Sequence, residues 1–225
     1  MLRRCEQPFQ TSNLKDPTML NIPPIRLLAG SHANTAHTGS GCFMNVVAYL
    51  NGEAQITDRS TCVCGVVRPI AIWLNDFMLG SCFSPSKQTA NSARLLPFIE
   101  RAMGSATSDA GELSRRAWLA VDFARSMASL AKTSTADATL AAGYAADAAC
   151  VADSFVTDTE AAAISAAAYA THATLAAGYA AYTAVAYEQI AQAGLGFLDR
   201  ALPPAPEAQP AQVVARAAAL RELAT

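Results

Sequence analysis

Three cysteines, Cys42, Cys62 and Cys64, come closest to a chemical site in this sequence. They flank a short apolar run and a polar turn in GCFMNVVAYLNGEAQITDRSTCVCG. With His32 or His37 as a fourth ligand, the three thiols would supply the mixture of Cys and His that tetrahedral zinc prefers. However, the Cys-x-Cys spacing is tighter than that of the usual zinc knuckle. We therefore keep zinc as the alternative and predict no cofactor.

A catalytic thiol is the second alternative for these residues. Cys42 follows TGSG at the expected start of a helix, where the positive end of the helix dipole lowers the pKa of a thiol. No sequence signature of a cysteine enzyme surrounds it. Free cysteines are among the most buried residues in proteins, and a reducing cytoplasm disfavours a Cys42–Cys62 disulfide. The main prediction is that the thiols fill space in the interior and that the chain is not an enzyme.

Composition excludes two classes of partner. The 225 residues carry a net charge of -2, whereas nucleic-acid binding needs clustered Lys and Arg to neutralise phosphates. No apolar run approaches the roughly 20 residues of a membrane-spanning helix, and MLRRCEQPFQ lacks the apolar centre of a secretory signal. We expect a cytoplasmic protein that binds neither nucleic acid nor membranes.

The distribution of Ala and Pro predicts an all-α fold with five consecutive regions. Ala has the highest helix propensity, most of the alanines follow residue 100, and regular strand patterns are nearly absent. The predicted regions are an irregular arm (1–40), a short-helix module with the cysteines (41–104), a bundle of long Ala-rich helices (105–202), a Pro-rich linker (203–210) and a C-terminal helix (211–225).

Within the cysteine module, CFMNVVAYL predicts a short helix that ends at Asn51-Gly52. Apolar residues at the spacing of one helical face predict a second helix over about 66–78; they are Ile70, Trp73, Leu74 and Phe77. We interpret Asn75 and Asp76, near the end of that helix, as structural residues. A loop marked by Gly80, Pro85 and Ser86 should then lead to a short helix at LLPFIERAM.

The helix that follows should begin near Asp109 and run to about Leu130. Asp109 and Glu112 have the spacing of a capping box. Glu112 and Arg116 are one helical turn apart, so we expect them to pair on the solvent-facing side. A helix over about 136–152 should follow, and then the longest helix, which opens with a capping box of Thr157 and Glu160 and runs to about Leu202.

The segment ATLAAGYAA occurs twice, at 138–146 and 173–181. In each copy Leu and Tyr lie four residues apart and share a helical face, while the small Ala side chains allow close packing of helices. One interpretation is an antiparallel helical pair inside one bundle. The other is self-association, in which tyrosines of these helices contact a second copy of the chain. The candidate interaction residues are Tyr144, Tyr169, Tyr179 and Tyr182.

The stretch GSHANTAHTGSGCFMNVVAYLNGEAQITDRSTCVCGVVRPIAIWLND, with RLLPFIERAMGSATSD and RRAWLAVDFARSMA, resembles a group of uncharacterised proteins of bacteria and bacteriophages. These proteins typically read Gly-Ser-His, Cys-x-Met-Glu, Ser-Asp-His-Pro-x-Cys and Asn-Asp, followed by an Ala-rich helical tail. Asn45 and Arg59 replace the Glu and the second His of that pattern, which removes two potential metal ligands. The resemblance points to His32, Cys42, Asp58, Cys62 and Asp76.

Together, these observations predict a non-enzymatic helical binding or accessory protein of a phage or mobile element. It would self-associate through its Ala/Tyr helices and act on a partner protein or a small ligand. The alternative is a thiol- or zinc-dependent protein or enzyme centred on Cys42, Cys62 and Cys64. A structural component of a virion is a variant of the first prediction.

Overall fold

A computed structural model describes residues 26–30, 40–53, 55–130, 165, 168, 169, 172 and 184–204. Five helices lie in this part of the chain: α1 (Phe43–Leu50), α2 (Val67–Leu79), α3 (Pro85–Ala102), α4 (Ala110–Leu130) and α7 (Ala184–Ala201). Two strands of two residues each, β1 (Arg26–Leu27) and β2 (Ser40–Gly41), pair in parallel, Arg26 with Ser40 and Leu27 with Gly41. The prediction of an all-α fold is confirmed.

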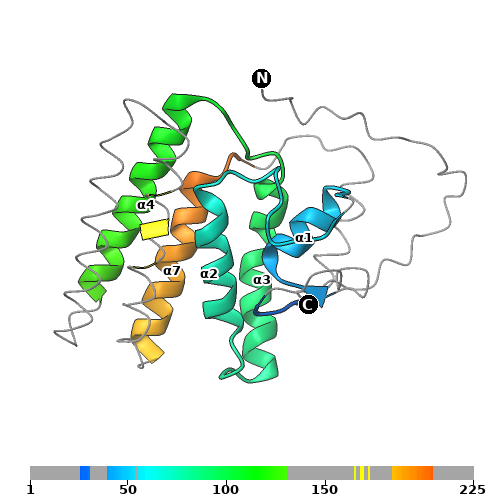
Figure 1. The fold of residues 1–225 in the computed structure, drawn as a ribbon. Helices are drawn as coiled ribbons and strands as arrows, with labels where there is room; N and C mark the ends of the chain where they lie inside the picture. The colour runs from blue at the N-terminus through cyan, green and yellow to red at the C-terminus, as the bar shows by residue number, and fades with distance from the viewer. Residues whose placement is uncertain are drawn as a thin grey trace, which may run out of the picture.

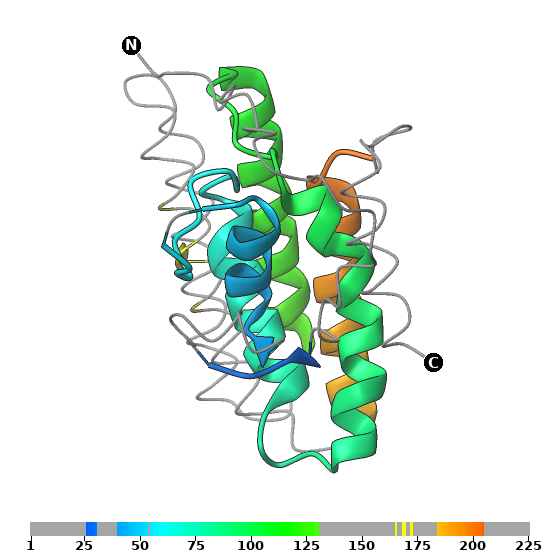
Figure 2. The ribbon, with the colours of Figure 1, turned by 90° about the vertical axis from the view of Figure 1, so that its right-hand side faces the viewer.

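Helix α7 lies between α4 and α2 in Figure 1 and packs against α4, α2 and α3. Helix α1 contacts α2 and α3 on the side away from α4. A quarter turn shows α3 and α7 together on one side and α1 with α2 on the other (Figure 2). The predicted Ala-rich bundle over 105–202 falls within the described residues mainly at its two ends, as α4 and α7.

Helices α1 and α2 occupy the predicted positions, but α3 is longer than predicted. The loop expected around Pro85 and Ser86 was wrong, because α3 begins at Pro85 and has 18 residues. Ser84 is the N-cap, and its hydroxyl accepts a hydrogen bond from the Lys87 amide at 3.4 Å. A Ser N-cap followed by Pro at the first helical position is a favoured helix start.

Helix α4 begins as the capping pattern predicted, since the Glu112 amide donates to Asp109 Oδ1 at 2.7 Å. The Glu112–Arg116 pair is also present, at 2.7 Å. Its expected position on the solvent-facing side was wrong, because only 5% of the Arg116 side chain is exposed. Arg116 Nη1 donates to the Ser105 carbonyl at 2.5 Å, so this guanidinium ties the start of α4 to the preceding connection.

One main hydrophobic core joins the five described helices. At its centre the rings of Trp73 (α2) and Phe123 (α4) lie 6.1 Å apart, and those of Phe123 and Phe197 (α7) lie 5.7 Å apart. The predicted regions 41–104 and 105–202 therefore share one core in the part of the chain that the structure describes. None of the helices in that part is long and apolar enough to cross a membrane.

The C-terminal end of α7 is fastened by arginines from two other helices. Arg101 of α3 donates to the carbonyls of Asp199, Leu202 and Pro203 and pairs with the Asp199 carboxylate at 2.7 Å. Arg115 of α4 donates to the Arg200 carbonyl at 2.9 Å. The last carbonyls of a helix lack partners inside the helix, so these side chains complete the end of α7.

Candidate functional site

The three predicted cysteines are all buried. Cys42 is the N-cap residue of α1, while Cys62 and Cys64 lie on the connection from α1 to α2. Their exposed fractions are 1%, 2% and 2%. This confirms the prediction that the thiols lie in the interior. The fourth candidate ligand, His32, lies outside the described residues.

Asn75 connects three elements around the start of α1 and is itself fully buried. Its Oδ1 accepts from the Phe43 amide at 3.1 Å, and its Nδ2 donates to the Leu28 carbonyl at 2.8 Å. The neighbouring Asp76 accepts from the Gly30 amide at 2.6 Å and from Asn75 Nδ2 at 3.0 Å. We call these contacts the Asn75 junction. They confirm the structural interpretation of Asn75 and Asp76.

The Cys42 thiol is held in its protonated form. Burial is the main cause that raises its pKa, and the negative charges of Asp76 and Asp58 raise it further. Backbone hydrogen bonds from Asn45 and Met44, at the start of α1, act in the opposite direction. Desolvation therefore outweighs the helix N-terminus that sequence alone indicated as an activating feature. A protonated thiol is a poor nucleophile and must lose its proton before it can bind a metal.

Cys62 belongs to a hydrogen-bonded chain that the sequence did not reveal. The Ser60 hydroxyl donates to Glu53 Oε1, and its oxygen lies 3.0 Å from Cys62 Sγ. Since a hydroxyl has a single proton and here gives it to the carboxylate, the thiol must donate to Ser60 Oγ. The chain therefore runs from thiol to hydroxyl to carboxylate.

Cys64 is fixed to the connection between α3 and α4. Its amide donates to Ser105 Oγ at 3.1 Å, and its carbonyl accepts from the Val67 and Arg68 amides at the start of α2, both at 3.0 Å. The Ala106 amide donates to the Cys62 carbonyl at 3.0 Å. The segment from Cys62 to Cys64 is thus joined by hydrogen bonds to the start of α2 and to the α3–α4 connection.

The three thiols do not form a metal site with any residue that the structure describes. No group of three or more His, Cys, Asp or Glu side chains is close enough to hold an ion among those residues. Of the residues to which the resemblance points, Cys42, Asp58 and Asp76 share one neighbourhood, because both carboxylates act on the pKa of Cys42. Cys62 is engaged separately, through Ser60.

One of the four candidate interaction tyrosines, Tyr169, lies within the described residues. It is half-buried and packs against the main core. The other three, Tyr144, Tyr179 and Tyr182, lie outside the described residues.

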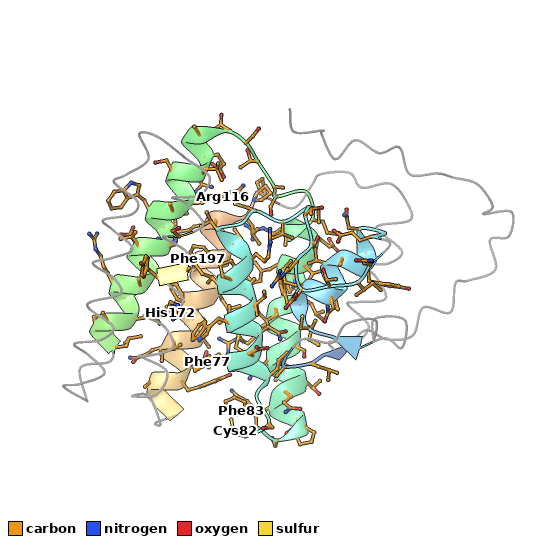
Figure 3. All side chains as sticks on the ribbon, in the orientation of Figure 1. Phe77, Cys82, Phe83, Arg116, His172 and Phe197 are labelled. Atoms are coloured by element: carbon orange, nitrogen blue, oxygen red, sulfur yellow. The ribbon has the colours of Figure 1, made fainter. Side chains whose placement is uncertain are left out.

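Tyr187 of α7 is a packing residue that was not among the candidate interaction tyrosines. Its ring stacks on Phe77 of α2 at 4.9 Å and contacts Phe83 at 4.8 Å, while Lys87 Nζ lies 5.5 Å from the ring centre. Its hydroxyl accepts from Asn91 Nδ2 at 2.7 Å, and burial raises its pKa to about 12. Phe77, Phe83 and the exposed Cys82 lie at the same end of the helices (Figure 3).

An open depression of about 610 Å³ lies between α4 and α7. It is lined by Ser126, Ser129 and Leu130 of α4 and by Glu188, Gln189 and Gln192 of α7. Ala193 lines it as well, and most of its surface is apolar, while the Ser, Gln and Glu side chains can form hydrogen bonds with a partner. No family model, no curated protein and no solved structure matches the chain.

Proposed function

We propose that the chain is a non-enzymatic helical binding protein that self-associates through its Ala/Tyr helices. It would act as an accessory protein of a phage or mobile element, in the cytoplasm of the host cell, on a partner protein or a small ligand. The net charge of -2 argues against nucleic acid as that partner.

One observation supports this proposal most strongly. The three candidate thiols and the side chains of Asn75 and Asp76 are buried or form hydrogen bonds that hold the fold together. The Cys42 thiol keeps its proton because it is buried beside two carboxylates. The Cys62 thiol donates to Ser60, and Asn75 and Asp76 hold the start of α1 and the chain after β1. A nucleophile needs a neighbouring base or a lowered pKa. Among the described residues, the surface is therefore the part left to act, and the open depression between α4 and α7 supports binding there.

The duplicated segment supports self-association. Tyr144 and Tyr179 occupy equivalent positions in the two copies of ATLAAGYAA, and tyrosines supply large contact areas at interfaces. Tyr169 packs against the core of its own chain. For this reason the test concentrates on Tyr144 and Tyr179.

Sedimentation velocity over a range of protein concentrations tests this proposal. We expect species heavier than the 23.5 kDa monomer, and we expect Tyr144→Ala combined with Tyr179→Ala to shift them to the monomer. The matched control, Tyr144→Phe with Tyr179→Phe, keeps both rings and should remain associated. A 23.5 kDa species at every concentration would contradict self-association.

Elemental analysis separates this proposal from the zinc-dependent alternative. Protein purified without chelators should contain zinc well below one equivalent, because no three His, Cys, Asp or Glu side chains among the described residues lie close enough together to hold an ion. Stoichiometric zinc that is lost in Cys62→Ser would favour the alternative. Thermal unfolding of the same variant would show whether the metal also supports folding.

A further inference from the structure

We infer that residues 55–61 form a strap that opens while the helices stay folded, and that this opening controls access to the Cys62 thiol. The strap lies on the connection from α1 to α2, directly before Cys62. It belongs to no helix or strand, and its bonds to the rest of the molecule lie at a few identifiable positions. This inference is independent of the proposed binding function.

The apolar contact of the strap lies outside the main core. Ile56 is 3% exposed and forms a separate small cluster with Ala48 of α1. Tyr49 packs against that cluster and is itself only half-buried. A contact between a few side chains stabilises a segment much less than the continuous core stabilises the helices, so local opening should precede global unfolding.

The polar contact of the strap is the chain of Glu53, Ser60 and Cys62. Ser60 Oγ donates to Glu53 on the α1 side of the strap and accepts from the Cys62 thiol on the α2 side. Ser60 is fully buried, and its hydroxyl joins Glu53 to Cys62 across the strap. If Ser60 leaves, the thiol loses this acceptor.

The movement should end at Cys62, because the chain beyond it is fixed. The Cys62 carbonyl accepts from Ala106, and Cys64 is bonded to Ser105 and to the start of α2. Cys62 and Cys64 both belong to the main core and are equally buried, each 2% exposed, but the contact with Ser60 of the strap is made by Cys62. Cys64 is therefore a matched control for Cys62, two positions along the same segment.

Alkylation by iodoacetamide as a function of urea concentration tests the inference. The sulfur displaces iodide from the reagent and its proton passes to the buffer; mass spectrometry with fragmentation assigns each modified cysteine. The exposed Cys82 should react at once and serves as the internal reference. Cys62 should react at a rate nearly independent of low urea concentrations, because local opening exposes little surface. Cys64 should react more slowly, with a steep urea dependence.

A substitution at Ser60 tests the hydrogen-bonded chain of Glu53, Ser60 and Cys62 separately from the rest of the strap. Ser60→Ala removes the acceptor of the thiol and the bond to Glu53, and we expect it to speed Cys62 alkylation by about tenfold while the Cys64 rate stays constant. Thr61→Ala, at an exposed neighbouring position of the strap, should change neither rate.

Equal rates and equal urea dependence for Cys62 and Cys64 in the wild-type protein would overturn the inference. So would an equal increase of both rates in Ser60→Ala, because that result would mean that access requires global unfolding. If Ser60→Ala does not fold, the wild-type urea series alone decides.

Discussion

Single buried polar side chains hold the loops of this protein to its helices. The side-chain amide of Asn75 accepts from the backbone amide of Phe43 and donates to the Leu28 carbonyl. Arg116 likewise donates to the Ser105 carbonyl. A backbone group enclosed away from water needs such a partner. The removal of one side chain therefore leaves two or more groups unsatisfied, and the effect exceeds that of one lost hydrogen bond.

Replacement of Asn75 tests this at the residue scale. Asn75→Leu keeps a similar size but leaves the Phe43 amide and the Leu28 carbonyl without their partner, so we expect the free energy of unfolding to fall by about 3 kcal/mol. Urea unfolding measures the change. Asn51→Ala is the control, because the bond from Asn51 to Glu53 is exposed, and it should change stability by less than about 0.5 kcal/mol. Equal losses in the two variants would contradict the role of the junction.

At the scale of elements, the crossing of α2 and α7 depends on a missing side chain. A Cβ atom at Gly194 would lie 2.6 Å from Leu74 Cδ1, which is closer than real contacts allow. At Gly196, one half-turn further along α7, a Cβ atom would meet nothing within 4 Å. The same change at two glycines of one helix thus separates packing from helix propensity.

Gly194→Ala should destabilise the protein by about 1–3 kcal/mol, because the added methyl group overpacks a filled interface. Gly196→Ala should stabilise it by about 0.5–1 kcal/mol, because Ala loses less backbone entropy than Gly in a helix. Thermal and urea unfolding measure both effects. In the double variant Leu74→Ala with Gly194→Ala, the two losses should not add, since the side chains share one space. Full additivity would show that the helices do not meet there.

The start of α4 should give the protein a pH-dependent stability. The hydrogen bond from Arg115, together with Arg116, lowers the pKa of Glu112 to about 2, from about 4.3 for an ordinary Glu. The folded state holds the proton less tightly than the unfolded state. The contribution of the Glu112 carboxylate to the free energy of unfolding is therefore complete above about pH 4.3 and is lost as the pH falls towards 2.

Urea unfolding of the wild type and of Glu112→Gln across this range measures the effect. We expect the variant to be less stable at neutral pH and the difference to shrink as the pH falls, because protonation removes the same charge from the wild type. Glu100→Gln, at a carboxylate with no ion pair among the described residues, should follow the wild-type profile. A stability difference between wild type and Glu112→Gln that does not change with pH would contradict the assignment of this pH dependence to Glu112.

At the scale of the whole molecule, one core includes residues from both sides of the change in composition near residue 104. Phe43 and Leu74 lie before that point and Phe123 and Phe197 after it, yet all four belong to one cluster. Helix α7 joins the two parts, because it follows them in sequence and packs against α4 as well as against α2 and α3. We expect the described helices to unfold as one cooperative unit.

Coincident unfolding transitions test that expectation. Tryptophan fluorescence reports Trp73 and Trp118, on α2 and α4, while far-UV circular dichroism reports all helices. The two probes should give the same urea midpoint, as in a two-state protein. The variants Trp118→Phe and Trp73→Phe each keep one tryptophan. If the fluorescence of one of them changed at a lower urea concentration than the circular dichroism, the two regions would unfold separately.

Sequence was sufficient for the fold class, for the positions of α1 and α2, for the cap of α4 and for the burial of the cysteines. The helix positions and the cap depend on residues within a turn or two of each other, where helical periodicity and capping act. The fold class followed from the Ala content, and the burial of the cysteines from the general tendency of free thiols to lie in the interior. Only the tertiary structure determined that Arg116 is enclosed, that Asn75 joins three elements and that Ser60 links Glu53 to Cys62. Periodicity shows which face of a helix is apolar, but which polar groups become enclosed depends on neighbours that are distant in sequence, and the contacts between Asn75 and Leu28 span 47 residues.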